Sequence, residues 1–175
     1  MAVARDPDRC PPGGLLLRFT VNGNPRPQGS KRALPVGKPC PVCKRSRTVL
    51  VEHADAKLKR WRKDVTTAAR EAWGGRAPLD QPLILGARFL FPRPPSHLKK
   101  SGGLRKGKPQ TKQDAPDLSK LVRAVEDALT DAKVWTDDQR VVGYSTIAKD
   151  YTRDAHAIGV EVVVQSWDPL WEVGR

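Results

Sequence analysis

The chain lacks any apolar run that approaches the ~20 residues needed to cross a bilayer. Its N-terminus, MAVARDPDRCPPGG, has no apolar core ahead of a small-residue cleavage site, so no signal peptide is expected. It has only three cysteines, an odd number that fits a reducing compartment better than a disulfide framework. We therefore expect a soluble, cytoplasmic protein with no membrane partner.

Several catalytic signatures are missing as well. There is no GxxxxGK[ST] phosphate loop and no HExxH zinc motif. The three histidines form no pattern of nucleophile and base. Few alternatives to the chemistry described below therefore remain.

The charge of the chain is unevenly distributed. Its net charge is +13, yet residues 1–113 hold 25 Lys and Arg against 7 Asp and Glu, while residues 114–175 hold 7 against 12. The cations gather in two acid-free tracts, 26–47 and 92–113, with seven in each. This distribution is typical of a nucleic-acid-binding protein, and the alternative is a solvated basic surface.

Hydrophobic periodicity predicts one α/β domain over residues 15–166, between a flexible lead, 1–14, and a tail, 167–175. The expected order is β-α-β-α-β-β with a mixed sheet. The elements are a strand at 15–22, a helix at 54–73, a strand at 82–91, a helix at 118–129, and strands at 141–148 and 158–165 that we expect to form a hairpin.

Two basic loops, 25–48 and 92–113, are expected to contact DNA phosphates, although plain flexible loops would have the same composition. Proline and glycine punctuate both, so no packed element is expected in 92–113. The candidate DNA-binding residues are Arg26, Lys31, Arg32, Lys99, Lys100, Arg105, Lys106 and Lys108.

A CxxC pair, Cys40 and Cys43, lies in the first basic tract, and His53 follows ten residues later. These three side chains are candidate zinc ligands, but a closed structural zinc site needs four. The alternatives are an unligated turn or a site that a second subunit completes.

An acidic stretch, 114–138, interrupts this basic chain with seven carboxylates against three cations. Carboxylates are the ligands that Mg²⁺ or Mn²⁺ prefers, and such an ion can bridge to phosphate. The pattern therefore predicts metal-assisted hydrolysis of a phosphodiester bond.

Within this stretch, Asp117 stands at the start of the second helix, and Asp137 and Asp138 follow beyond its end. We interpret these three as candidate metal ligands, with Lys120 and Arg123 as cations that could steady a phosphate. The alternatives are a helix N-cap at Asp117, a polar turn at 137–138, and solvated helix charge at the two cations.

The sequence resembles the RusA-type Holliday-junction resolvases, endonucleases common in phages and prophages. The resemblance rests on the runs Pro116-Asp117-Leu118-Ser119-Lys120-Leu121-Val122-Arg123, Asp127-Ala128-Leu129 and Val134-Trp135-Thr136-Asp137-Asp138-Gln139-Arg140-Val141. The upstream run Pro25–Arg32 resembles the family's basic loop. The resemblance implies a homodimer that binds four-way DNA junctions and cuts two strands of like polarity with Mg²⁺ or Mn²⁺, in DNA recombination and repair.

The resemblance also assigns residues. Asp117 matches the first family aspartate, Asp138 matches the last, and Arg123 stands where the family often has lysine. Ser119 occupies the position of a second aspartate, so one negative charge is lost. Either Asp114, Asp137 or Asp127 compensates in an active enzyme, or the protein is a non-catalytic binder of structured DNA.

Overall fold

The computed structural model describes residues 14–29, 31–52 and 56–167, and so leaves out most of the predicted lead and tail. Its helices and strands are β1 (Leu15–Asn22), β2 (Lys31–Val36), β3 (Arg47–Glu52), α1 (Ala56–Trp73), β4 (Leu83–Pro92), α2 (Leu118–Asp131), β5 (Val141–Thr152) and β6 (Gly159–Ser166). Short 3₁₀ turns lie at Pro95–His97, Asp138–Arg140 and Ala155–Ala157.

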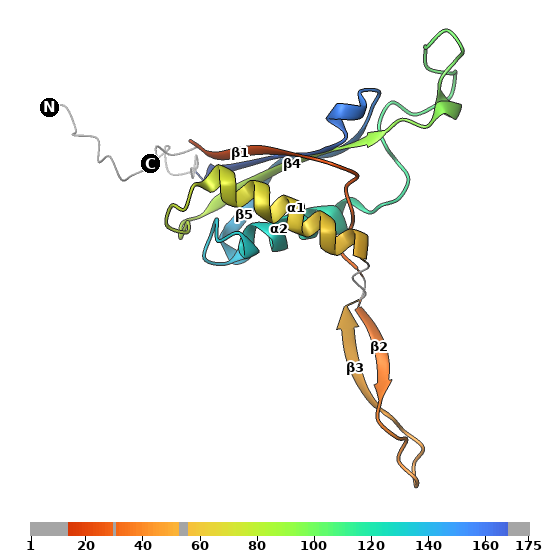
Figure 1. Cartoon of the computed structure of the whole chain (residues 1–175), viewed down its shortest axis with the longest axis vertical. Coiled ribbons are helices and arrows are strands. Elements are labelled where there is room, and N and C mark those ends of the chain that lie inside the picture. The colour runs from red at the N-terminus through yellow and green to blue at the C-terminus, as the bar shows by residue number, and fades with distance from the viewer. Residues whose placement is uncertain (1–13, 30, 53–55, 168–175) are drawn as a thin grey trace, which may run out of the picture.

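Four strands form a mixed sheet in the order β1-β6-β4-β5, and both helices lie along it (Figure 1). β4 and β5 are parallel, while β6 runs antiparallel to both of its neighbours. The predicted fold class, one α/β domain with a mixed sheet, is confirmed. Among the described residues, no helix is long and apolar enough to span a bilayer.

Alternating apolar side chains on the central strands face the helices and build the core. Phe19 of β1 pairs in register with Val162 of β6, which pairs with Ala87 of β4, and all three are buried. The helices contribute Trp61 and Val65 from α1, and α2 adds a buried stripe of Leu121, Val122, Val125, Ala128 and Leu129. Burial of these apolar surfaces is the main stabilising term in the fold.

The prediction that the last two strands form a hairpin is wrong. β6 inserts between β1 and β4, and β5 pairs with the other edge of β4. β6 is buried at Val160, Val162 and Val164 and therefore suits a central position, whereas every residue of β5 is exposed or half-buried, as on an edge strand. The two strands are consecutive in sequence but are not neighbours in the sheet.

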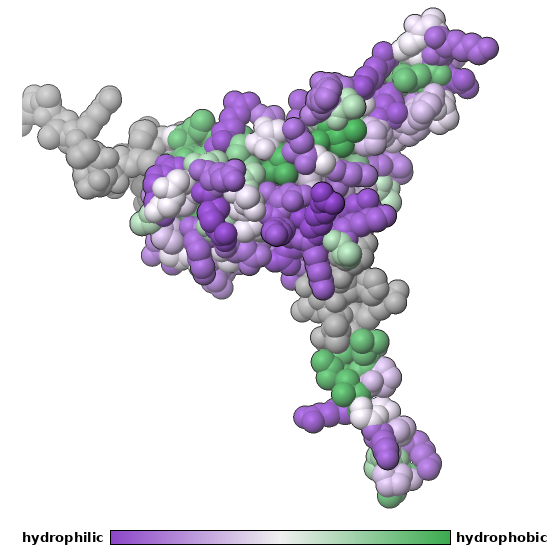
Figure 2. Space-filling model, viewed as in Figure 1, coloured by the Kyte–Doolittle hydropathy of each residue, from purple (hydrophilic) through white to green (hydrophobic). Residues whose placement is uncertain are grey.

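The basic loop predicted at 25–48 contains a hairpin that the sequence pattern did not reveal. β2 and β3 pair antiparallel from Lys31 opposite Glu52 to Val36 opposite Arg47. Figure 1 shows this pair as an arm that projects from the body. Leu34, Val36 and Val49 are exposed on it, which gives the apolar patch seen on the arm in Figure 2.

The second basic segment, 92–113, was expected to hold no packed element, but Pro92 is the last residue of β4 and the remainder is tied to the body. The Arg93 guanidinium donates to the Pro109 carbonyl at 2.9 Å and to the Gln110 carbonyl at 2.6 Å. At its end, the carboxylate of Asp114 accepts from the Lys112 ammonium at 3.0 Å and from the Tyr151 hydroxyl at 2.9 Å. These bonds fix the segment that leads into α2.

We predict that the Asp114 carboxyl titrates far below its ordinary range in the folded protein. Hydrogen bonds from Lys112 and then Tyr151 lower its pKa from 3.8 to about 2. The contribution of these bonds to stability is therefore complete above pH 3.8 and is lost as the pH falls through about 2. Carbon-13 NMR titration of the aspartate carboxyls measures this pKa directly.

In the Lys112→Met variant the pKa of Asp114 should rise towards 3.8, because Lys112 is the larger cause of the shift. Tyr151→Phe removes the smaller cause and should raise it less. An Asp114 resonance that titrates near 3.8 in the unsubstituted protein would contradict the contacts described above.

Candidate functional site

Asp117 stands at the N-terminus of α2, but its side chain does not cap the helix. Asp117 occupies the N-cap position, yet its carboxylate makes no capping hydrogen bond. It pairs instead with the Lys120 ammonium at 3.2 Å, and the two side chains are 66% and 46% exposed. An ion pair this exposed contributes little to stability, so the carboxylate remains open to a ligand.

Ser119, Arg123 and Glu126 share one flank of α2, because they follow one another at helical spacings of four and three. Ser119 and Arg123 are exposed. Among the described residues, Arg123 has no ion pair. Its guanidinium is therefore free to meet an anion on this flank.

Glu126 connects α2 to β5 in the middle of this flank. Its carboxylate accepts a hydrogen bond from the Tyr144 hydroxyl at 2.7 Å. This bond, followed by burial and the negative charges of Glu126 and Asp138, raises the pKa of Tyr144 to about 12. The sequence reasoning gave no role to Tyr144, because only the packing of α2 on β5 brings it to Glu126.

Asp137 and Asp138 lie beyond the C-terminal end of α2. The Asp137 carboxylate accepts from the Gln139 backbone N–H at 2.9 Å and caps the 3₁₀ turn that Asp138 begins. Asp80, from the segment before β4, accepts from Thr136 at 3.0 Å and pairs with Arg140 at 2.7 Å. In the described part of the chain Asp138 is exposed and makes no ion pair.

The candidate ligands therefore stand at opposite ends of α2. With 14 residues, the helix is about 20 Å long at 1.5 Å per residue. Near one end Lys149 donates to the Pro116 carbonyl at 2.7 Å, and near the other Asp138 directly precedes β5. Within the described residues, no three His, Cys, Asp or Glu side chains form a group that could hold a metal ion.

Of the three carboxylates that could replace the one missing at Ser119, only Asp114 lies at the same end of α2 as Asp117. The Lys149 ammonium bridges the Asp114 and Pro116 carbonyls at 2.6 and 2.7 Å. Asp127 instead faces α1, 3.7 Å from Arg62, and Asp137 lies at the far end.

The candidate DNA-binding residues surround the Asp117 end of the molecule. The loop that carries Arg26 is held against the first turn of α2, where the Gln28 N–H donates to the Lys120 carbonyl at 2.8 Å. Lys31 and Arg32 begin β2. Both basic segments leave the body near the end where the two helices begin (Figure 1). The exposed cations of the second segment are Lys99, Lys100, Arg105, Lys106 and Lys108.

The CxxC pair lies in the turn between β2 and β3, where Cys40 and Cys43 are both free. The Lys44 N–H donates to the Cys40 carbonyl at 2.9 Å and closes the turn. Backbone N–H groups of Cys43 and Val42 lower the pKa of the Cys40 thiol. His53 lies outside the described residues, and zinc binding stays a prediction.

Comparison with known proteins bears on the candidate carboxylates and on the second basic segment. No curated protein matches the chain. The family model described as endodeoxyribonuclease RusA matches residues 33–164, a range that includes α2, β4, β5 and all but the last two residues of β6. The chain belongs to the RusA endodeoxyribonuclease family.

Proposed function

We propose that this protein is a divalent-metal-dependent endonuclease that resolves Holliday junctions as a homodimer. One observation carries the proposal: Asp117 and Asp138 are exposed carboxylates that flank α2, a helix that also presents the exposed Arg123. Family membership supplies the reaction class, and the basic segments near Asp117 suit a phosphate backbone.

The donor set at these two ends fits Mg²⁺ or Mn²⁺, because both ions prefer carboxylate oxygens. When bound, such an ion would activate water and neutralise charge on the phosphate. The chain's own residues hold and position the substrate: Arg123 and Lys120 would meet the phosphate oxygens, and Asp117 and Asp138 would hold the ion. Asp114 is our candidate for the charge that Ser119 does not provide.

The free edge of β5 is our candidate for the dimer contact. Residues 111 and 112 cover the strand at Asp150 and Lys149, but among the described residues no second strand pairs with the edge from 141 to 148. Val142 and Tyr144 are 53% and 57% exposed on this strand. A long apolar edge with unpaired backbone groups favours pairing with a second chain.

Two-fold pairing of these edges would run antiparallel and would bring the ends of α2 together in trans. Val141 and Lys149 are separated by eight residues of β5, roughly 26 Å, so a two-fold axis near Tyr144 places the Lys149 end of one protomer beside the Val141 end of the other. Each site would then combine Asp117 with Asp138 of the partner subunit. Two such sites suit a junction with two equivalent strands.

The first prediction from the proposed function concerns Asp138. The Asp138→Asn variant should nick a labelled four-way junction more than about 100-fold more slowly than the unsubstituted protein, beyond what loss of an outer-shell partner costs. Junction binding should be kept or improved, because a negative charge is removed. Asp64→Asn, an exposed aspartate of α1, is the matched control and should cleave normally. Normal cleavage by Asp138→Asn would refute the metal assignment.

The second prediction tests the arrangement in trans. Asp117→Asn and Asp138→Asn should each be inactive alone, yet heterodimers formed by co-expression should contain one intact site. With random assembly, nicking should recover to about a quarter of the unsubstituted level, since half of the dimers have one of two sites. Sites built within one chain would give no recovery, an outcome that rejects the trans arrangement and leaves the nuclease function standing.

The third prediction concerns the missing carboxylate. Ser119→Asp should lower the Mg²⁺ concentration for half-maximal cleavage by about ten-fold, because metal affinity follows the charge of the ligand set. Ser119→Asn has similar size without the charge and should behave like the unsubstituted protein. An unchanged Mg²⁺ titration in Ser119→Asp would show that position 119 lies off the site.

A further inference from the structure

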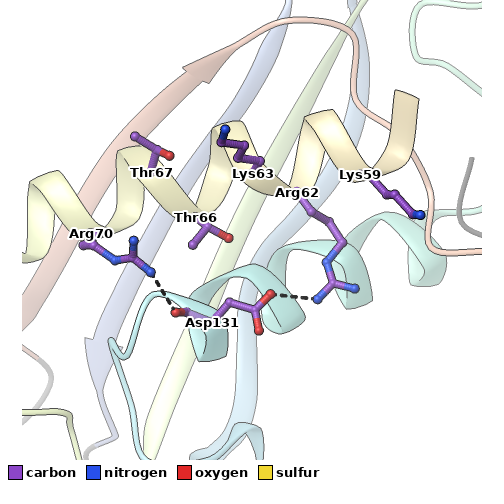
Figure 3. Close-up of a pocket in the computed structure, with 7 residues that line it drawn as sticks. All are labelled: Lys59, Arg62, Lys63, Thr66, Thr67, Arg70 and Asp131. Atoms are coloured by element: carbon purple, nitrogen blue, oxygen red, sulfur yellow. Dashed lines mark hydrogen bonds and ion pairs between the residues drawn. The ribbon is translucent and has the colours of Figure 1, made fainter. Parts of the chain in front are cut away.

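A basic groove lies between the two helices, on the side of α1 that faces away from the sheet. It has a volume of about 510 Å³ and is lined by Lys59, Arg62, Lys63, Thr66, Thr67, Arg70 and Asp131 (Figure 3). Four cations thus face one carboxylate. None of these residues belongs to the two basic segments or to the carboxylate site.

The lining residues form a line along α1 because of their spacing. Lys59, Lys63, Thr66 and Arg70 follow one another at intervals of four, three and four, so their side chains share one face. From Lys59 to Arg70 this face extends for about 16 Å at 1.5 Å per residue. Figure 2 shows hydrophilic side chains gathered over this part of the body.

Contacts with α2 fix the two arginines of the groove. The Arg62 guanidinium pairs with the Asp131 carboxylate at 2.8 Å and approaches that of Asp127 at 3.7 Å. The Arg70 guanidinium donates to the Asp131 carbonyl at 3.1 Å. Asp131, the acid of the lining, is thus already paired, and the groove keeps a net positive charge.

The two lysines of the groove, Lys59 and Lys63, differ from these arginines. Lys59 and Lys63 are exposed, and within the described ranges neither makes an ion pair. Neither contributes to the core, which α1 joins through Leu58, Trp61 and Val65 on its other face. Their charges are therefore available to an external anion.

We propose that this groove binds the sugar-phosphate backbone of a DNA strand, as a contact additional to the two basic segments. The cations are spread over a length that matches roughly five nucleotides at 3.4 Å per nucleotide, whereas a free phosphate would need a compact cup. Lys59 lies in the first turn of α1, at the end of the body near which both basic segments leave. The proposal rests on the function proposed above.

The test compares two double variants of α1 that remove the same charge. Lys59→Gln with Lys63→Gln removes the free cations of the groove, and Lys57→Gln with Arg60→Gln removes two exposed cations outside it. Junction binding is measured by fluorescence anisotropy at increasing salt, without divalent metal, so that no cleavage occurs. Circular dichroism checks that both proteins fold.

The groove variant should bind the junction at least about ten-fold more weakly at moderate salt. The negative slope of log K against log salt should become shallower by about 2, one for each lost phosphate contact. The control should change the slope much less. Lys59→Arg with Lys63→Arg should restore binding, because it restores the charge. Equal weakening of the groove variant and the control would overturn the proposal.

Three further outcomes separate the possible failures. In the first, inorganic phosphate is titrated while backbone amide NMR shifts are followed. Phosphate binding in the groove, together with an unchanged DNA affinity of the groove variant, would assign the groove to a small anion and overturn the proposal. Junction binding without nicking would refute the nuclease function; the binding of the groove variant relative to the control would still support or overturn the groove proposal. Normal nicking with equal binding by both variants would refute the groove alone.

Discussion

The packing of α2 is the constraint on which the rest of the structure depends. One face of the helix is buried against the sheet through Leu121, Val125 and Leu129, and its sides contact α1 through Asp131 and β5 through Glu126. A rigid helix of about 20 Å keeps its two ends apart. It therefore places Asp117 at one end of the helix and leaves Asp138 beyond the other. The proposed metal site, which uses both carboxylates, accordingly calls for two chains.

Charge is divided between the parts of the molecule according to the same logic. Two exposed carboxylates, Asp117 and Asp138, flank α2, while cations occupy the two projecting segments and the outer face of α1. A basic surface attracts a polyanion over a Debye length, about 10 Å at 0.1 M salt, without reading its sequence. In the proposed mechanism, a divalent cation at the acidic residues would offset their repulsion of a phosphate and would so couple binding to chemistry.

Much of this could be predicted from the sequence, and the errors have physical causes. The 3.6-residue period predicted all of α1 and most of α2, since the apolar residues of an amphipathic helix recur on the face that packs against the core. The placing of β6 between β1 and β4 could not be predicted, because strand order depends on which strands are buried at both edges. The candidate ligands follow from residue type and family resemblance, and the distance between them follows from helix length. Tyr144 depends on packing, so no local pattern revealed it.

The central claim is that the unsubstituted protein cleaves branched DNA with a divalent metal. The most direct measurement is the nicking of a labelled synthetic four-way junction, compared with linear duplex of the same sequence, in Mg²⁺ or Mn²⁺ and in excess chelator. The account predicts paired nicks in two strands of like polarity at the junction, no cleavage of the duplex, and no cleavage in chelator. Tight junction binding without nicks, even at high Mn²⁺, would contradict it and would favour a non-catalytic binder.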